Sequence, residues 1–313
     1  MNVRTALKEG IARLREAGAS SYIRSAELLL LHSLGCNRAW LYAHPEESIS
    51  DAHAGQFLAL IGRRASGEPT QHLTGKQEFW GLEFEVSPDV LIPRPETEHV
   101  IEVALDRLAL RELRAGRPQK NSGDGLLIAD IGTGSGCIAV AFAKELPDAI
   151  IYATDNSLAA LAVARRNGKR HNCTRIHFIE SNLLDQVQGP VAEQKHAALL
   201  RAGKKPLAHS RSLDLIVSNP PYIGRREAET LEREVREHEP ESALYGGEEG
   251  YEIYAGLIAQ AATRLRLGGI LVLELGHNSL PAVRPLLDAA NWSNVGVTND
   301  LAGIPRIIAA EKL

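Results

Sequence analysis

Short apolar segments alternate with helical patterns along the chain after residue 96. Strand-like runs stand at residues 126–132 (LLIADIG), 150–155 (IIYATD), 175–181 (RIHFIES), 213–219 (LDLIVSN) and 269–276 (GILVLELG). Apolar strands that alternate with helices are typical of α/β proteins, in which the helices cover both faces of the sheet. The pattern therefore predicts a doubly wound, mainly parallel sheet that binds its ligands at the carboxyl ends of the strands.

The first 75 residues carry a helical pattern of their own. Apolar residues recur at helical spacing in three places: Leu7, Ile11 and Leu14, then Ala26–Leu34, then Ala54–Ile61. We expect a small helical bundle over residues 1–75. Its second helix should open at Ser25, because serine is a frequent N-cap residue.

Residues 76–95 separate this bundle from the sheet. Two aromatic and β-branched stretches flank Gly81, which predicts a β-hairpin. Pro88, Pro93 and Pro95 then restrict the backbone to a rigid connector. We therefore predict three parts: a helical domain at 1–75, a hairpin with connector at 76–95 and a catalytic domain at 96–313.

Composition and charge narrow the class of partner and the compartment. The chain has 313 residues, a net charge of −4 and a pI near 6.3, whereas a dedicated nucleic-acid binder usually has a strongly basic face. No apolar run approaches the roughly 18 residues of a membrane span. Cys36, Cys137 and Cys173 show no paired spacing. We expect a monomer in the reducing cytoplasm that binds no membrane.

A turn of small residues follows the strand at 126–132. It consists of Gly132, Thr133, Gly134, Ser135 and Gly136. Alternate glycines permit a tight turn and a close approach of the backbone to a ligand. Cys137 stands where a dinucleotide-binding turn has its last glycine, which favours a nucleoside ligand without phosphates. Asp155 ends the next strand, where a carboxylate can accept both ribose hydroxyls. A plain tight connection and a helix cap are the alternatives.

The strand at 213–218 runs directly into Asn219-Pro220-Pro221-Tyr222. Two consecutive prolines fix φ at about −65° and remove two backbone donors, which leaves carbonyl oxygens that only accept hydrogen bonds. The side-chain oxygen of Asn219 and the carbonyl of Pro220 can hold the two hydrogens of a planar NH2 group. Tyr222 can form a flat wall beside that group. An ordinary exit from a strand into a turn is the alternative.

An NH2 group held in this way can receive a methyl group. The lone pair of an amide nitrogen is delocalised into its carbonyl, and two acceptors on its hydrogens raise its electron density and fix it for in-line displacement. Such placement can be worth roughly 7–11 kcal/mol, so no strong base or metal ion is required. Beside a nucleoside site, the tetrapeptide predicts an S-adenosylmethionine-dependent methyltransferase that acts on an amide or an exocyclic amine.

Seven segments distributed over the chain carry a resemblance to a known family. They are GEPTQHLTG (67–75), EFWGLEFEV (78–86), LIPRPETE (91–98), DIGTGSGCIA (130–139), DLIVSNPPYI (214–223), EPESALYGGEEG (239–250) and LAGIPRIIAAEK (301–312). In content and order they resemble the release factor glutamine methyltransferases, the HemK/PrmC family. NPPY alone is shared with amino-directed nucleic-acid methyltransferases, whereas LIPRPETE joined to it is much more specific.

The resemblance implies a class I methyltransferase fold and a defined reaction. The expected reaction is methylation, by S-adenosylmethionine, of the glutamine amide in the Gly-Gly-Gln tip of class 1 peptide-chain release factors. By the same resemblance, Gly132–Gly136 line the methionine and ribose part of the cofactor, Asp155 binds the ribose and Leu183 lies near the adenine. Asn219–Tyr222 would hold the glutamine, with Asn219 also bordering the cofactor. The N-terminal helices would recognise the release factor outside its tip.

Three features of the sequence leave alternatives open. Arg94 and Thr97 either close over the methionine end of the cofactor or belong to a connector that caps the following helix. Asn182 stands where the family usually has an acidic residue. The segment between Asp185 and Leu213 is long and locally basic. It is either a solvated excursion or a contact to a ribonucleoprotein or an acidic partner.

Three other functions compete with the one that the resemblance implies. A ribosomal-protein glutamine methyltransferase would use the same chemistry on another protein. A DNA or RNA adenine methyltransferase would flip a base into the same pocket, and it should show a basic, aromatic-rich region, whereas only 5% of these residues are aromatic. A non-enzymatic scaffold that binds the cofactor would not need the complete NPPY corner.

Overall fold

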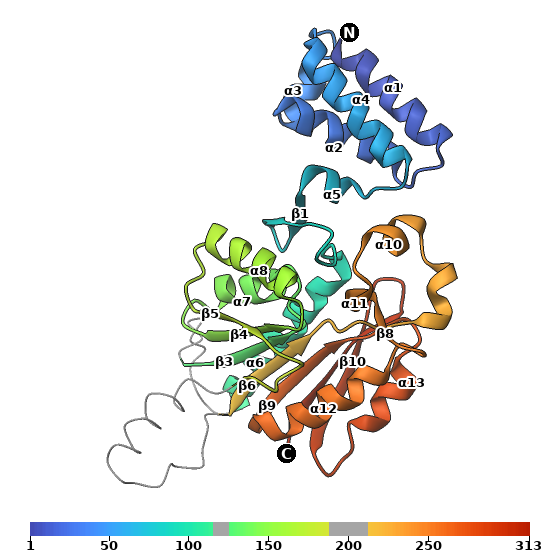
Figure 1. Cartoon of the computed structure of the whole chain (residues 1–313). Coiled ribbons are helices and arrows are strands. Elements are labelled where there is room, and N and C mark those ends of the chain that lie inside the picture. Colours follow the sequence, from blue (N-terminus) through green and yellow to red (C-terminus); the bar gives the residue numbers. More distant parts are fainter. Residues whose placement is uncertain (115–124, 188–211) are drawn as a thin grey trace.

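The computed structural model describes residues 1–114, 125–187 and 212–313. Its centre is a seven-stranded sheet in the order β10-β11-β9-β6-β3-β4-β5 (Figure 1). The strands are β3 (Leu127–Ile131), β4 (Ile150–Asp155), β5 (Ile176–Glu180), β6 (Leu213–Ser218), β9 (Leu265–Glu274), β10 (Trp292–Asn299) and β11 (Pro305–Lys312). Neighbours from β9 to β5 pair in parallel, and β11 runs antiparallel to both β9 and β10. The predicted doubly wound, mainly parallel sheet is confirmed.

Both faces of the central strands are buried, which explains why β3, β4, β6 and β9 are mostly apolar. Ile128 and Val217 belong to one hydrophobic core, and their neighbours Ala129 and Ile216 belong to the other. Side chains alternate across a strand, so each face needs its own layer of helices. The helices that pack with the first core are α6 (Glu98–Arg114) and α7 (Cys137–Glu145), and those with the second are α12 (Glu252–Arg264) and α13 (Leu280–Val283).

The N-terminal residues form a helical bundle with a separate hydrophobic core. Its helices are α1 (Val3–Glu16), α2 (Tyr22–Leu34), α3 (Arg38–Ala43), α4 (Asp51–Ala65) and α5 (Thr70–Thr74). The prediction that Ser25 opens the second helix is wrong, because α2 begins at Tyr22. Ser25 is instead buried, and its hydroxyl accepts a hydrogen bond from Thr70 Oγ1 at 3.0 Å. The hairpin at Gly81 is confirmed as β1 (Lys76–Phe79) and β2 (Leu82–Glu85).

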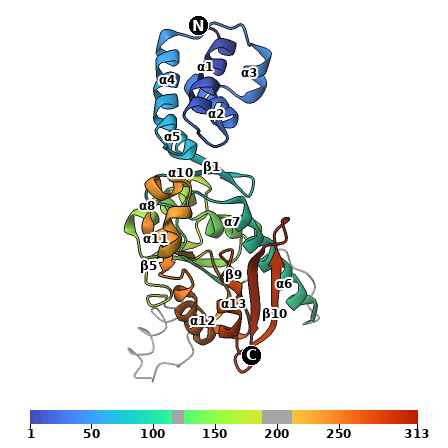
Figure 2. The ribbon, with the colours of Figure 1, turned by 90° about the vertical axis from the view of Figure 1, so that its right-hand side faces the viewer.

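The bundle contacts the short helix α10 (Arg233–His238), which lies beneath it (Figures 1 and 2). The buried guanidinium of Arg64 in α4 forms an ion pair with Glu234 at 2.5 Å. Glu234 also accepts a hydrogen bond from Ser20 Oγ at 2.9 Å. Polar contacts to α10 therefore help to hold the bundle, and the boundaries predicted at residues 75 and 95 remain a prediction.

The remaining elements lie around this framework. They are η1 (Pro95–Thr97), α8 (Leu158–Arg170), β7 (Ile223–Gly224), η2 (Arg225–Thr230), α11 (Glu241–Leu244), β8 (Tyr245–Gly247) and η3 (Arg284–Leu286). The antiparallel pair β10 and β11 was not expected from the strand-like runs. No helix among the described residues is long and apolar enough to span a membrane. Most of the basic 185–213 segment lies outside the described residues.

Candidate active site

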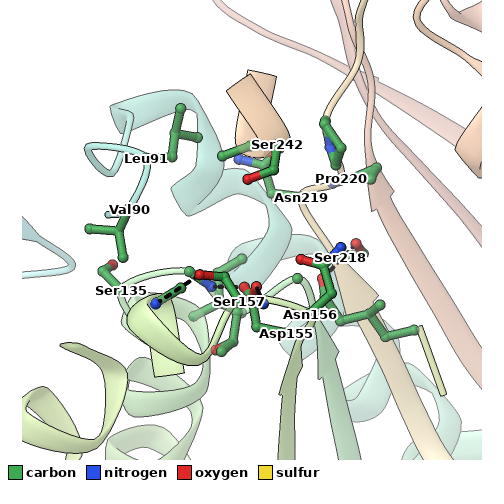
Figure 3. A pocket seen from close by; sticks show the side chains of 18 of the residues that line it. Val90, Leu91, Ser135, Asp155, Asn156, Ser157, Ser218, Asn219, Pro220 and Ser242 are labelled. Carbon is green, nitrogen blue, oxygen red and sulfur yellow. Dashed lines mark hydrogen bonds between the residues drawn. The ribbon is translucent and has the colours of Figure 1, made fainter. Parts of the chain in front are cut away.

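A cavity of about 360 Å³ opens at the carboxyl ends of β3, β4 and β6. Nearly all of the residues predicted for the site line it, namely Gly132, Thr133, Gly134, Ser135, Asp155, Leu183, Asn219, Pro220 and Pro221. Figure 3 shows Asn219 and Pro220 on one side of the cavity, with Asp155 and Ser135 on the other. Two predicted residues, Gly136 and Tyr222, are not part of its lining.

The turn after β3 has a backbone that requires its glycines. Gly132, Gly134 and Gly136 have φ values of 69°, 53° and 82°, a region that side chains other than glycine rarely adopt. A Cβ atom on Gly136 would also lie 3.1 Å from the Cβ of Ala164 in α8. Gly136 therefore allows α7 and α8 to pack closely, while the first two glycines shape the floor of the cavity.

Asp155 is held in place by two backbone N–H groups. Its Oδ2 accepts from Gly134 N and its Oδ1 from Ser157 N, each at 2.9 Å. Burial raises the pKa of this carboxyl, and the two hydrogen bonds partly offset that effect. Each oxygen keeps a lone pair that can accept a hydroxyl, so the geometry fits the predicted ribose contact.

Asp130 lies beneath the same turn and is fully buried. Its Oδ2 accepts from the Thr133 hydroxyl at 2.6 Å, and its Oδ1 has no hydrogen bond of regular geometry among the described residues, although the Ala139 N–H lies near enough to lower the pKa of the carboxyl. Burial raises the pKa of this carboxyl to about 7. Asp130 is not part of the cavity lining, and through the Thr133 hydroxyl it braces the turn from below.

The far end of the cavity is apolar. Leu183, Ile253 and Leu257 contribute its apolar lining, and Asn156 and Asn182 also line the cavity. Leu183 has a φ of 52°, and the following Leu184 N–H is fixed by Gln260 Oε1 at 2.8 Å. A flat aromatic base fits between such aliphatic walls, and the two amides can read its polar edge.

The segment Asn219–Tyr222, here called the acceptor corner, begins with the amide of Asn219. Its Nδ2 donates to Thr97 Oγ1 at 3.0 Å, so its Oδ1 remains available as an acceptor. Pro220 is buried beside it and has no N–H. Asn219 and Pro220 both line the cavity, and their role as acceptors for the target group stays a prediction.

Tyr222 does not face the cavity in this structure. Its hydroxyl donates to Glu274 Oε1 at 3.2 Å, and its ring lies against the position of Gly276. Burial and the charge of Glu274 both raise the pKa of Tyr222, which keeps its hydroxyl protonated. Its role as a wall for the target group stays a prediction.

Arg94 and Thr97 were given the same two alternative roles from the sequence, but they make different contacts in the structure. Arg94 forms an ion pair with the buried carboxylate of Glu239 and is not part of the cavity lining. Thr97 lines the cavity and holds Asn219. Helix α6 begins at the next residue, Glu98, whose carboxylate accepts from Trp80 N at 2.7 Å. Thr97 is therefore a site residue, and Arg94 braces the connector.

Comparisons with known proteins identify the family. The PrmC N-terminal domain matches residues 5–75, and the methyltransferase small domain matches residues 118–193. A release factor glutamine methyltransferase from Koribacter versatilis is 38% identical, over 100% of this chain and 99% of its own length. The chain belongs to the release factor glutamine methyltransferases. The enzyme of that name from Burkholderia pseudomallei is 40% identical, over 90% of this chain and 89% of its own. The predicted family and enzyme class are thereby confirmed.

Sequence reasoning missed several residues of this methyltransferase site. Ser157, Ser242 and Val90 line the cavity. Glu274 lies outside the lining and accepts a hydrogen bond from Tyr222. Ser157 carried a visible signal, since it follows Asp155 at the head of a helix, where serine commonly caps. Glu274 also carried one, as a lone acid at the end of an apolar strand. Val90 comes from a loop and Ser242 from the short helix α11, and neither segment has a local sequence signature that would place it at the cavity.

Proposed function

We propose that this enzyme transfers a methyl group from S-adenosylmethionine to the side-chain amide nitrogen of the glutamine in the Gly-Gly-Gln motif of class 1 peptide-chain release factors. The observation that carries the proposal is the orientation of Asn219. Its NH2 group is engaged by Thr97, which leaves its oxygen as an acceptor at the cavity. A primary amide presents two N–H donors, and the Asn219 side-chain oxygen and the Pro220 carbonyl are two hydrogen-bond acceptors that could receive them.

The residues around the cavity fit the cofactor. The turn at Gly132–Gly136 and the carboxylate of Asp155 would hold its methionine and ribose parts, and Leu183 and Leu257 would contact its adenine. Bound there, S-adenosylmethionine supplies an electrophilic methyl group on a sulfonium ion. The chain contributes placement, since no described side chain beside Asn219 is a strong base at neutral pH.

The acceptor corner would prepare the glutamine for reaction. Asn219 Oδ1 accepts one amide hydrogen and the Pro220 carbonyl accepts the other, which orients the nitrogen and raises its electron density. The methylated nitrogen is a strong acid, and its extra proton leaves along these oxygens to solvent. Catalysis on this account comes from geometry and polarity together.

The N-terminal bundle would provide the specificity that a three-residue tip lacks. Its Arg64 forms an ion pair with Glu234 of α10, which belongs to the catalytic part of the chain. Ile23 and Tyr42 are exposed on the bundle, and such apolar side chains suit a protein partner. We place the enzyme in the cytoplasm as a monomer that acts on free release factor without binding nucleic acid.

Mass spectrometry of a recombinant release factor tests this proposal. After incubation with the enzyme and S-adenosylmethionine, we expect one added methyl group on the Gly-Gly-Gln glutamine. A release factor with alanine in place of that glutamine should gain none. Methylation of ribosomal protein or of adenine in preference to the release factor would overturn the proposed substrate.

A further inference from the structure

Behind Asn219, hydrogen-bonding side chains from three distant parts of the chain meet. Thr97, in η1, accepts the Asn219 Nδ2 hydrogen at 3.0 Å. Tyr222, beyond the corner, donates its hydroxyl to Glu274 Oε1 at 3.2 Å. Glu274 ends strand β9 and is only 1% exposed. None of the roles proposed above uses the charge of Glu274.

Thr97 is bonded to Asn219 and also neighbours Glu274. The Thr97 hydroxyl lies close enough to the Glu274 carboxyl to favour its ionised form through a side-chain hydrogen bond. A hydroxyl has one proton, so Thr97 can accept from Asn219 only while its own proton points elsewhere. The ionised carboxyl is the acceptor that draws this proton away. Glu274 Oε2 is buried and has no hydrogen bond of regular geometry in the part of the chain that the structure describes, so this oxygen is free to receive the Thr97 proton.

We infer that Glu274 is a positioning residue that fixes which face of the Asn219 amide points into the cavity. The ionised carboxylate orients the Thr97 hydroxyl, which then accepts from the NH2 group of Asn219 and turns its oxygen toward the acceptor glutamine. The same carboxylate accepts from Tyr222 and holds the other side of the corner. The inference rests on the proposed function, because an oxygen is needed there only for a target that donates hydrogens.

Protonation of Glu274 would reverse this polarity. A neutral carboxyl can donate to Thr97, which would then donate to Asn219, and the amide would turn its NH2 group toward an NH2 substrate. Burial raises the pKa of Glu274 to about 7. The hydrogen bonds from Thr97 and Tyr222 and the charge of Arg306 lower it, and the charge of Glu96 raises it. Tyr254, packed from α12, donates its hydroxyl to the backbone oxygen of Glu274 at 2.7 Å.

The sign of the resulting pH dependence follows directly. Well above pH 7 Glu274 is ionised and the Asn219 oxygen faces the target amide, so kcat should be at its maximum. As the pH falls below about 7 the carboxyl gains a proton, and kcat should decline on an acidic limb. The affinity for S-adenosylmethionine should follow this limb only weakly, because Glu274 is not part of the cavity lining.

Steady-state kinetics of Thr97 and Glu274 variants test the inference with full-length enzyme and release factor. T97V keeps the side-chain volume and removes the hydroxyl, and we expect kcat to fall about 100-fold while the Kd for S-adenosylmethionine changes less than about threefold. T97S should restore most of the activity. E274Q offers an acceptor to only one of the two hydroxyls, so kcat should fall about tenfold at pH 8, and its acidic limb should disappear.

Two exposed carboxylates on the neighbouring segment provide matched controls. E96Q removes a charge that raises the pKa of Glu274, so the acidic limb should move to lower pH. E102Q, on the exposed side of α6, should leave the profile unchanged. The inference is overturned if E274Q retains the acidic limb, or if T97V keeps wild-type kcat. If the wild-type enzyme itself fails to methylate the Gly-Gly-Gln glutamine, it is the proposed function that fails.

Discussion

The two halves of the cavity are built in different ways. The cofactor half is local, since the glycine turn, Asp155 and Ser157 come from two adjacent strands and bond mainly through the backbone. The acceptor half depends on side chains, and Asn219 is held by Thr97, 122 residues earlier in the chain. Tyr222 is held by Glu274, 52 residues later. Binding of the cofactor and transfer of its methyl group should therefore fail independently when each half is changed.

The substitution N219A should give the largest effect on the acceptor half. Losing the oxygen that holds the target amide should lower kcat about 1000-fold, in the range of a lost transition-state hydrogen bond. The Kd for S-adenosylmethionine, measured by calorimetry, should stay within about threefold of wild type, because most of the cofactor's binding energy comes from the glycine turn and Asp155. A parallel loss of cofactor binding would show that the two halves are not separate.

The substitution D155A tests the cofactor half in the opposite sense. Two hydroxyls would lose a charged acceptor, so the Kd for S-adenosylmethionine should rise roughly 10–100-fold. At saturating cofactor, kcat should recover to near the wild-type value. D148A, in the turn before β4, serves as the control and should bind normally. A kcat that stays low at saturation would contradict the division.

The substitution Y222F should produce the smallest change and sharpen the comparison within the acceptor half. The ring is kept and one hydrogen bond to Glu274 is lost, so kcat at pH 8 should fall about threefold. The Tyr222 hydroxyl lowers the pKa of Glu274, so its removal should move the acidic limb to higher pH. An unchanged pH profile would mean that Tyr222 and Glu274 are not coupled.

The same contrast explains what the sequence could predict. Gly132–Gly136, Asp155 and Asn219–Tyr222 were predicted because each lies within a short stretch at the end of a strand, where parallel strands place their ligands. Thr97 was considered without its link to Asn219, and Glu274 was missed. Their roles depend on tertiary contacts between η1, β9 and the segment after β6, which no local sequence pattern predicts.

The two terminal strands were missed for a related reason. Residues 292–299 are mostly part-exposed, so β10 lacks the apolar run that marks β3 or β6. β10 lies at the edge of the sheet and pairs with β11 through an irregular register. An edge strand of this kind has the composition of a loop and is defined by its partner.

A crystal structure with S-adenosylhomocysteine and a peptide containing Gly-Gly-Gln would test the central claim most directly. Glutamine Nε2 should lie about 3 Å from both Asn219 Oδ1 and the Pro220 carbonyl oxygen, with Asn219 Nδ2 still on Thr97. A glutamine bound elsewhere, or an Asn219 amide that presents its nitrogen to the peptide, would contradict the account.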